Sequence, residues 1–129
     1  MEDAGYYSSA ADILSGDKLF TVVSYDRRYN SRSSGDRSKD MTVAQHARDA
    51  AAIIKAMGFE KAVVVGRSGG AVIALELAAA RPELVEFLIA HEPPVIELLP
   101  DSDAQKWRIF VDRTKSKDGR PLKLNSCSL

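Results

Sequence analysis

The sequence predicts an α/β fold of three layers (α/β/α), in which helices cover both faces of a mostly parallel sheet. Short apolar runs alternate with longer stretches of helical periodicity, in the order strand, helix, strand, helix, strand. Connections between parallel strands almost always turn right-handed, which places the helices on the faces of the sheet. A serine between glycines stands where one apolar strand becomes a helix. Because functional side chains gather at the carboxyl ends of parallel strands, we expect a site there.

The first third of the chain is expected to hold a helix, a strand and a loop. Apolar residues at helical spacing, followed by Gly16, predict a short amphipathic helix over residues 4–15. The β-branched and aromatic run LFTVVSY predicts a buried strand over Leu19–Tyr25. The polar segment over residues 26–40 lacks a period and predicts a long loop.

The middle of the chain predicts a second helix and a second strand. Thr42, with Gln45 three residues later, is typical of a helix start, and one apolar face continues from there to Gly58. The run Ala62–Val65 is fully apolar, as in a strand buried on both faces of a parallel sheet.

A third helix and a third strand follow. Residues 69–80 are nearly all apolar, with Glu76 as the one charged side chain, so this helix needs cover on most sides. Arg81 precedes a proline and ends the helix, and the run VEFLIA then predicts a short strand that closes at His91.

Charge and composition narrow the classes of partner. The chain of 129 residues has one domain's length, and its 18 basic and 18 acidic residues give no field that would select nucleic acid or an anionic membrane. Cys127 is the single cysteine, and the sequence has no Cys/His cluster, which predicts a metal-free protein from a reducing compartment. No apolar stretch is long enough for a membrane span, and the N-terminus is acidic and polar, so we expect a cytoplasmic location.

The stretch GRSGG carries the strongest chemical signal. Gly66, Ser68 and Gly70 match the G-x-S-x-G pattern of a nucleophile elbow, a strained turn between a strand and a helix. A serine hydroxyl in such a turn needs a base to take its proton and N–H donors to hold an oxyanion. A dinucleotide-binding loop would need glycines in place of Ser68 and Ala71, and the Gly-Lys-Ser/Thr of a P-loop is absent. A helix N-cap or a phosphate site remains as the alternative for the serine.

These segments resemble the α/β-hydrolase family, in particular its esterase and haloperoxidase-like members. The resemblance covers residues 5 to about 100, from a helix that follows the family's third strand to just past its sixth strand. Two quoted stretches carry it: TVVSYDRRYNSRS, and VAQHARDAAAIIKAMGFEKAVVVGRSGGAVIALELAAARPELVEFLIAHEPP. Tyr29 and Ser31 stand where the family usually has glycines, and Arg67 replaces the commoner histidine before the serine.

The resemblance implies a set of site residues. Ser68 is then the nucleophile, the Gly69 N–H is one oxyanion donor, and Gly66, Arg67 and Gly70 complete the elbow. The family's second oxyanion donor comes from a loop before the matched region, and its acid and base come from strands after it. We therefore expect this chain to be an internal piece of a hydrolase, or the product of a truncated or misjoined gene model.

Two residues at the end of the third strand are candidates for the missing roles. His91 is a candidate base, because that strand end should lie beside the serine, and its alternative role is that of a strand-end residue lining the pocket. Glu92 follows it at the strand position where some lipases of the family carry their acid, so the resemblance implies a candidate acid there. Neighbouring residues on a strand point to opposite faces, so both can aim at Ser68 only across a bend, which Pro93 and Pro94 would supply.

Two other titratable residues are expected to be structural. His46 lies on the helix before the serine strand, and we expect it to be structural or exposed. Asp26 follows the first predicted strand, and we expect it to cap or pair with Arg27 or Arg28 in its own loop.

The resemblance also bears on how the chain is organised. We expect residues 1–112 to form a partial α/β-hydrolase domain and residues 113–129 a basic, disordered tail, with five basic residues against one acidic. In the family, another strand lies between those at 19–25 and 62–65, so here the two must pair with each other or the chain folds poorly. Exposed sheet edges and the apolar helix at 69–80 are candidate surfaces for self-association.

The resulting expectation is serine-dependent hydrolysis of an ester-like small molecule without a cofactor. We expect that activity to be impaired in this chain, because acid, base and second oxyanion donor are missing. The alternative is a non-catalytic module that binds a ligand or partner beside the serine. A further alternative is a module that binds an anion through the N–H groups of the turn.

Overall fold

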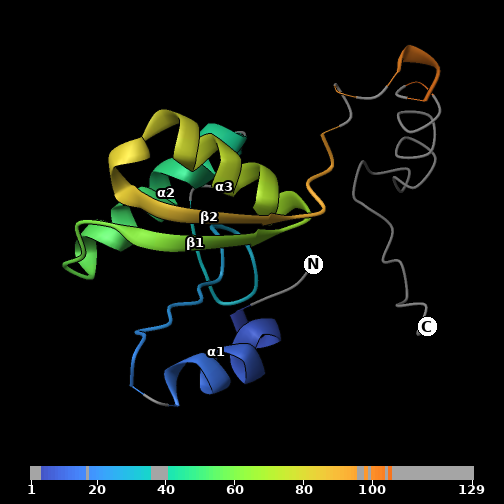
Figure 1. Ribbon diagram of the computed structural model, residues 1–129. Helices are drawn as coiled ribbons and strands as arrows, with labels where there is room; N and C mark the ends of the chain where they lie inside the picture. The colour runs from blue at the N-terminus through green and yellow to red at the C-terminus, as the bar shows by residue number, and fades with distance from the viewer. Residues whose placement is uncertain are drawn as a thin grey trace.

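The computed structural model describes residues 4–16, 18–35, 41–95, 98, 100–103 and 105 of the chain. The expected tail at 113–129 and Cys127 lie outside these residues. Figure 1 shows the elements in order: η1 (Ala4–Tyr7), α1 (Ser8–Ser15), α2 (Val43–Ala56), β1 (Ala62–Arg67), α3 (Gly69–Ala80), η2 (Pro82–Leu84) and β2 (Val85–His91).

The chain passes from β1 to β2 through α3 and η2, and the two strands pair in parallel. The register runs from Val63 opposite Phe87 to Arg67 opposite His91. Figure 1 shows the strands side by side with both arrowheads at the same end. The predicted α/β class with a parallel sheet is therefore confirmed, and both strands deliver their carboxyl ends to one edge.

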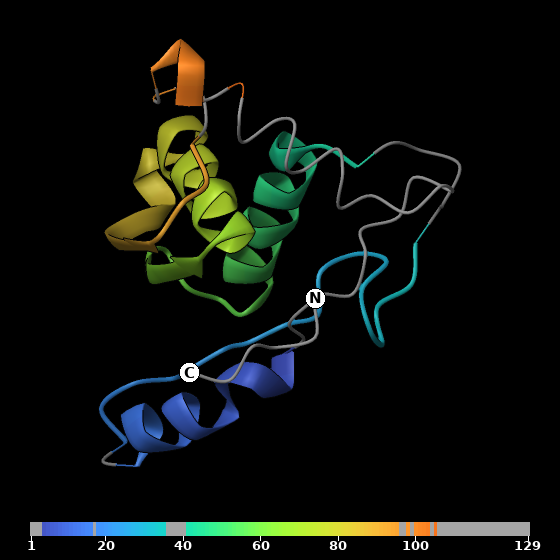
Figure 2. The ribbon, with the colours of Figure 1, turned by 90° about the vertical axis from the view of Figure 1, so that its right-hand side faces the viewer.

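One face of this sheet carries a pair of packed helices. α3 contacts both strands, α2 packs on α3, and Figure 2 shows the two helices together on the same side of the strands. Small side chains on α2 let the helices approach closely. The buried core consists of Ala47 and Ala51 of α2, Ile73 and Leu77 of α3, and Leu84, with Val64 and Val85 packed against it.

The opposite face of the sheet has no helix packed across its apolar part in the described part of the chain. Its apolar side chains are Val63, Val65, Phe87 and Ile89, which are 50%, 61%, 67% and 54% exposed. We expected a strand at 62–65 to be buried on both faces, and this prediction is wrong for one face. The physical reason is that the described helices α2 and α3 both pack on the other side.

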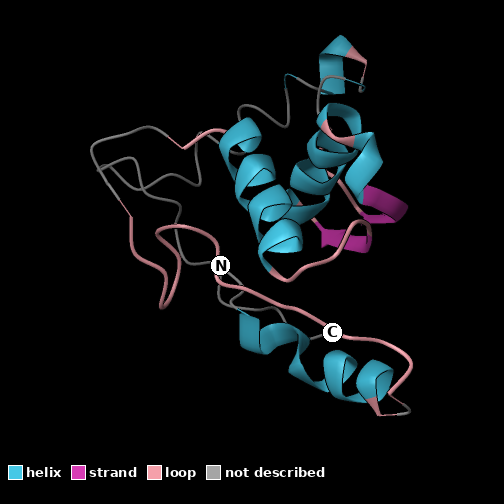
Figure 3. Cartoon of the chain, turned by 90° about the vertical axis from the view of Figure 1, so that its left-hand side faces the viewer, coloured by secondary structure: helices cyan, strands magenta, loops and turns pink. Residues whose placement is uncertain are grey.

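The predicted strand at Leu19–Tyr25 does not form. Residues 20–27 have no regular structure, and the described sheet holds only β1 and β2. Figure 3 draws the segment as a loop that runs between α1 and the rest of the molecule. An isolated strand has no partner for its N–H and C=O groups, and Leu19 and Phe20 stay 77% and 59% exposed. The prediction failed because a strand, unlike a helix, depends on a neighbour.

The predicted helices are observed at both of the expected places before the serine. α2 begins after Thr42, whose hydroxyl accepts a hydrogen bond from the Gln45 N–H at 3.1 Å, as predicted. Its end passes into Gly58 with a φ of 79°, a conformation that favours glycine. The helix predicted over residues 4–15 is present as η1 and α1, and none of its residues is buried.

Two arginine–aspartate pairs hold the loop that follows residue 25. Arg28 reaches α2, where its Nε and Nη2 donate to the Asp49 carboxylate at 2.9 and 2.6 Å. Arg32 donates from Nε to Asp26 at 2.7 Å, and this hydrogen bond is the main reason why the pKa of Asp26 is lowered. Asp26 does pair within its own loop, but its partner is Arg32 and not Arg27 or Arg28.

No helix in the described ranges is long and apolar enough to cross a membrane.

Candidate active site at the carboxyl edge of the sheet

Ser68 is the single residue between β1, which ends at Arg67, and α3, which begins at Gly69. Its φ of 51° and ψ of −125° are rare for a residue with a side chain, and such strain persists only where the surroundings enforce it. The Ser68 N–H donates to the His91 carbonyl at 2.9 Å, and the Ser68 carbonyl accepts the Ala71 N–H at 2.9 Å. The turn is thus held from both sides, and the serine itself is exposed.

The three glycines around Ser68 lie in different surroundings. A Cβ atom on Gly66 would collide with the Gly70 carbonyl oxygen and lie 2.7 Å from the Ala71 Cα. The backbones of β1 and α3 are therefore in direct contact here, with no room for a side chain between them. A Cβ atom on Gly69 or Gly70 would meet nothing within 4 Å. The space beside Ser68 is therefore open at the start of α3.

The first amides of α3 point out of the helix without an intrahelical acceptor. The Gly69 N–H has no hydrogen-bond acceptor among the described residues, and Gly69 is exposed. The N-terminal end of a helix also carries a partial positive charge. An oxyanion formed on a carbonyl attacked by the neighbouring serine would meet a donor there.

The backbone of His91 lies beside the serine turn, because its carbonyl accepts the Ser68 N–H, and Glu92 is the next residue of the chain. The bend occurs at Glu92, which has a φ of 49°, one residue before the prolines expected to provide it. The His91 Nδ1 lies 3.7 Å from a Glu92 carboxylate oxygen, with side chains 59% and 75% exposed. In the described part of the chain, no hydrogen bond joins the His91 imidazole to the Ser68 hydroxyl. The His91 backbone therefore lies next to Ser68, but the contact that would pass the serine proton to the imidazole is not formed among the described residues.

Comparison with known proteins decides the family. A family model described as "alpha/beta hydrolase fold" matches residues 6–122. The chain belongs to the α/β-hydrolase family. Its fold and its family resemblance are thereby confirmed.

The α/β-hydrolase relatives are longer than this chain. It is 36% identical over 126 residues to the uncharacterized hydrolase YraK of Bacillus subtilis (strain 168), covering 96% of this chain and 46% of YraK. It is 32% identical over 94 residues to the putative carbamate hydrolase RutD of Serratia proteamaculans (strain 568), covering 73% of this chain and 33% of that protein. RutD of Yersinia enterocolitica (serotype O:8 / biotype 1B, strain NCTC 13174 / 8081) is 33% identical over 91 residues, covering 70% of this chain and 31% of that protein. The chain thus spans less than half the length of these relatives.

Arg67 makes a contact that sequence patterns did not indicate. Its register partner on β2 is His91, and neighbours in register share a face of the sheet. Its Nη1 donates to the Tyr6 hydroxyl of η1, and its guanidinium carbon lies 5.5 Å from the centre of the Tyr6 ring. The two residues are separated by 61 positions in sequence, and no local periodicity signals such a pair.

His46 lies in a different part of this α/β-hydrolase chain. It sits on α2, and partial burial is the main reason why its pKa is lowered, followed by the charge of Arg27 in the preceding loop. Its surroundings are therefore that loop and α2, in line with the expected structural role.

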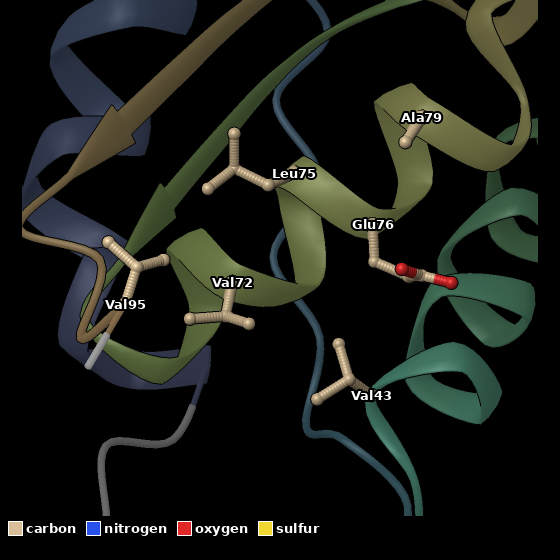
Figure 4. A pocket seen from close by; sticks show the side chains of 6 residues that line it. All are labelled: Val43, Val72, Leu75, Glu76, Ala79 and Val95. Atoms are coloured by element: carbon tan, nitrogen blue, oxygen red, sulfur yellow. The ribbon is translucent and has the colours of Figure 1, made fainter. Parts of the chain in front are cut away.

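A pocket of about 410 Å³ opens beside α3. Figure 4 shows its six lining side chains: Val43 at the start of α2, Val72, Leu75, Glu76 and Ala79 of α3, and Val95. The lining is apolar except for the Glu76 carboxylate. Ser68, Gly69 and His91 are not part of it, so the pocket and the serine turn are separate features on neighbouring parts of α3.

Proposed function

We propose that this chain carries the nucleophile of a serine hydrolase acting on ester-like small molecules. Ser68 Oγ would attack the substrate's carbonyl carbon, and the Gly69 N–H would hold the resulting oxyanion. The alcohol would then leave with the proton taken from Ser68, and water would release the acyl group from the serine. The observation that carries the proposal is the strained, exposed turn of Ser68, followed directly by a Gly69 N–H that has no acceptor among the described residues.

The proposed substrate class is a small carboxylic ester or a carbamate. Two relatives are named putative carbamate hydrolases, and both compound classes present the same kind of carbonyl to an attacking serine. The proposed chemistry requires no metal or cofactor, and the balanced charge of the chain offers no reason to propose a nucleic acid or membrane partner. We place the protein in the cytoplasm as part of the same proposal.

His91 is the proposed base, with Glu92 as its acid, and their action is expected to be weak. Support comes from the Ser68 N–H bond to the His91 carbonyl, which keeps the two residues adjacent, and from the exposure of the imidazole. Because no hydrogen bond joins the imidazole to the Ser68 hydroxyl in the described residues, we expect impaired turnover. Enzymes that lack a member of such a triad still retain about 10³–10⁴-fold catalysis over water.

A fluorophosphonate probe, which reacts with activated serines, tests the proposal. We expect the purified chain to be labelled, and labelling to disappear in Ser68→Ala but persist in Ser9→Ala, a matched change at an exposed serine of α1. His91→Gln should slow labelling without abolishing it. A chain that melts cooperatively by circular dichroism yet stays unlabelled would contradict the hydrolase proposal.

The second candidate is a non-catalytic module that binds a ligand or partner. The pocket between α2, α3 and Val95 favours it, because that pocket is apolar, carries one carboxylate and excludes Ser68. A small apolar amine should then bind saturably, and Leu75→Asp should abolish binding, whereas Ser68→Ala should not. Labelling at Ser68 would favour the first candidate over this one.

A further inference from the structure

We propose that Arg67 is a positioning residue, which fastens the N-terminal turn η1 to the sheet edge beside Ser68. Arg67 is the last residue of β1 and directly precedes the serine. Its guanidinium both donates a hydrogen bond to the Tyr6 hydroxyl and lies 5.5 Å from the centre of the Tyr6 ring. A planar guanidinium can engage an aromatic residue in both ways, which a lysine ammonium does less well.

The turn is attached at its other end as well. The Ala4 N–H donates to Asp26 at 2.7 Å, and the Ser24 hydroxyl donates to the Ala4 carbonyl at 3.2 Å. Asp26 itself is held by Arg32, and its side chain is only 5% exposed. η1 therefore bridges the segment around residues 24–26 and the end of β1.

This bridge matters because packing does not fix the N-terminal segment. No residue of η1 or α1 is buried, and all views show α1 apart from α2 and α3. The unformed strand at 19–25 gives no ladder of hydrogen bonds to the sheet either. The polar contacts at Ala4 and Tyr6 thus help to hold this segment against the part of the chain that bears Ser68.

The attachment also brings an aromatic side chain against Arg67, the residue that directly precedes the serine. Arg67 and its register partner His91 lie on one face of the sheet, so the Tyr6 bound to Arg67 is on that same face. Tyr7 packs edge-to-face on Tyr6 with ring centres 5.1 Å apart. Resting on the proposed function, we infer that this pair forms a wall contacting the apolar part of a substrate held at Ser68.

The test uses the full chain with the variants Arg67→Met, Tyr6→Phe and their double variant. Arg48→Met is the matched control, because Arg48 is an exposed arginine of α2 that bonds Gln45 on its own helix. Hydrogen exchange of residues 4–15, measured by mass spectrometry, should rise about two- to fivefold in each single variant. The double variant should show no further rise, exchange in α2 and α3 should stay unchanged, and Arg67→Lys should restore part of the protection.

Fluorophosphonate labelling supplies a second, independent readout. In Arg67→Met the half-saturating probe concentration should rise about two- to fivefold while the maximal labelling rate stays the same. Unchanged exchange of residues 4–15 in Arg67→Met would overturn the attachment, and an unchanged half-saturating concentration would overturn the wall. If the wild-type chain is not labelled at all, the hydrolase proposal and the wall fail, and the exchange data still decide the attachment.

Discussion

Ser68 adopts a backbone conformation that costs a residue with a side chain about 1–3 kcal/mol. The hydrogen bonds to His91 and from Ala71 hold it there, and the missing Cβ of Gly66 lets α3 start directly against β1. The spacing of GRSGG predicts the serine between strand and helix, because this pattern is local. The bend at Glu92 and the Arg67–Tyr6 contact have no local signal, since both depend on how distant segments meet.

Gly66→Ala should destabilise the fold. The added methyl group would lie 2.7 Å from the Ala71 Cα, and neither backbone can yield cheaply, so we expect a loss of about 1–3 kcal/mol in the free energy of unfolding. Gly69→Ala is the matched control, because its methyl group would meet nothing within 4 Å. Urea unfolding measures both, and equal stabilities of the two variants would contradict the assigned role of Gly66.

Ser68→Gly and Ser68→Ala should separate strain from chemistry. Both remove the hydroxyl, but only glycine reaches a φ of 51° without a clash. After subtraction of glycine's larger entropy loss, we expect the glycine variant to unfold with a free energy about 1 kcal/mol higher than the alanine variant. Thermal unfolding of the two variants, without any probe, compares their stabilities directly. A less stable glycine variant would argue against strain at this turn.

At the scale of the elements, helices and the strands flanking α3 follow from sequence, whereas the first strand does not. The apolar face of α2 and its Thr42 cap depend only on residues close in sequence. They therefore predict the helix without knowledge of the rest of the fold. LFTVVSY has strand composition, yet without a neighbour it stays extended and unpaired. The same limit applies to β1, whose apolar run cannot reveal which face has a helix on it.

The pair between Arg28 and Asp49 should make stability depend on pH. The hydrogen bond from Arg28 is the main reason why the pKa of Asp49 is lowered. A lowered folded pKa means that the stabilisation is complete above the unfolded pKa of about 3.9 and is lost as pH falls through the folded pKa. We therefore expect the free energy of unfolding to decrease below about pH 4.

Asp49→Asn tests this assignment. The variant should lose up to about 1 kcal/mol at neutral pH, a small value because the pair is partly exposed, and its stability should fall less steeply in acid. Glu60→Gln, at an exposed position, is the control and should keep the wild-type slope. Urea unfolding across the acid range measures both, and equal slopes for wild type and Asp49→Asn would exclude this pair as the source.

At the scale of the whole molecule, the chain combines a well-packed side with an uncovered one. α2 and α3 bury the core, while Val63, Val65, Phe87 and Ile89 form a bare apolar face. Contiguous exposed apolar patches of this kind mark interaction surfaces or aggregation sites. The chain spans 46% of the length of YraK, and its sequence is sufficient to predict the family.

We expect the chain to self-associate through this bare face. Sedimentation velocity should show the weight-average mass rising with concentration, because association would remove the four apolar side chains from water. Phe87→Lys, at a position 67% exposed on the face, should shift the chain towards monomer. Ile13→Lys, on the 79% exposed Ile13 of α1, should not. Identical association of Phe87→Lys and wild type would place the contact elsewhere.

The hydrogen bond from the Ser68 N–H to the His91 carbonyl has a mechanical consequence. It adds one hydrogen bond to the ladder between β1 and β2, beyond the end of β1, in the turn that carries the Ser68 hydroxyl. A pulling force applied to the chain after β2 would act first on this hydrogen bond between Ser68 and His91. We therefore expect a pulling force to release Ser68 from its strained backbone conformation before the core around Leu77 unpacks.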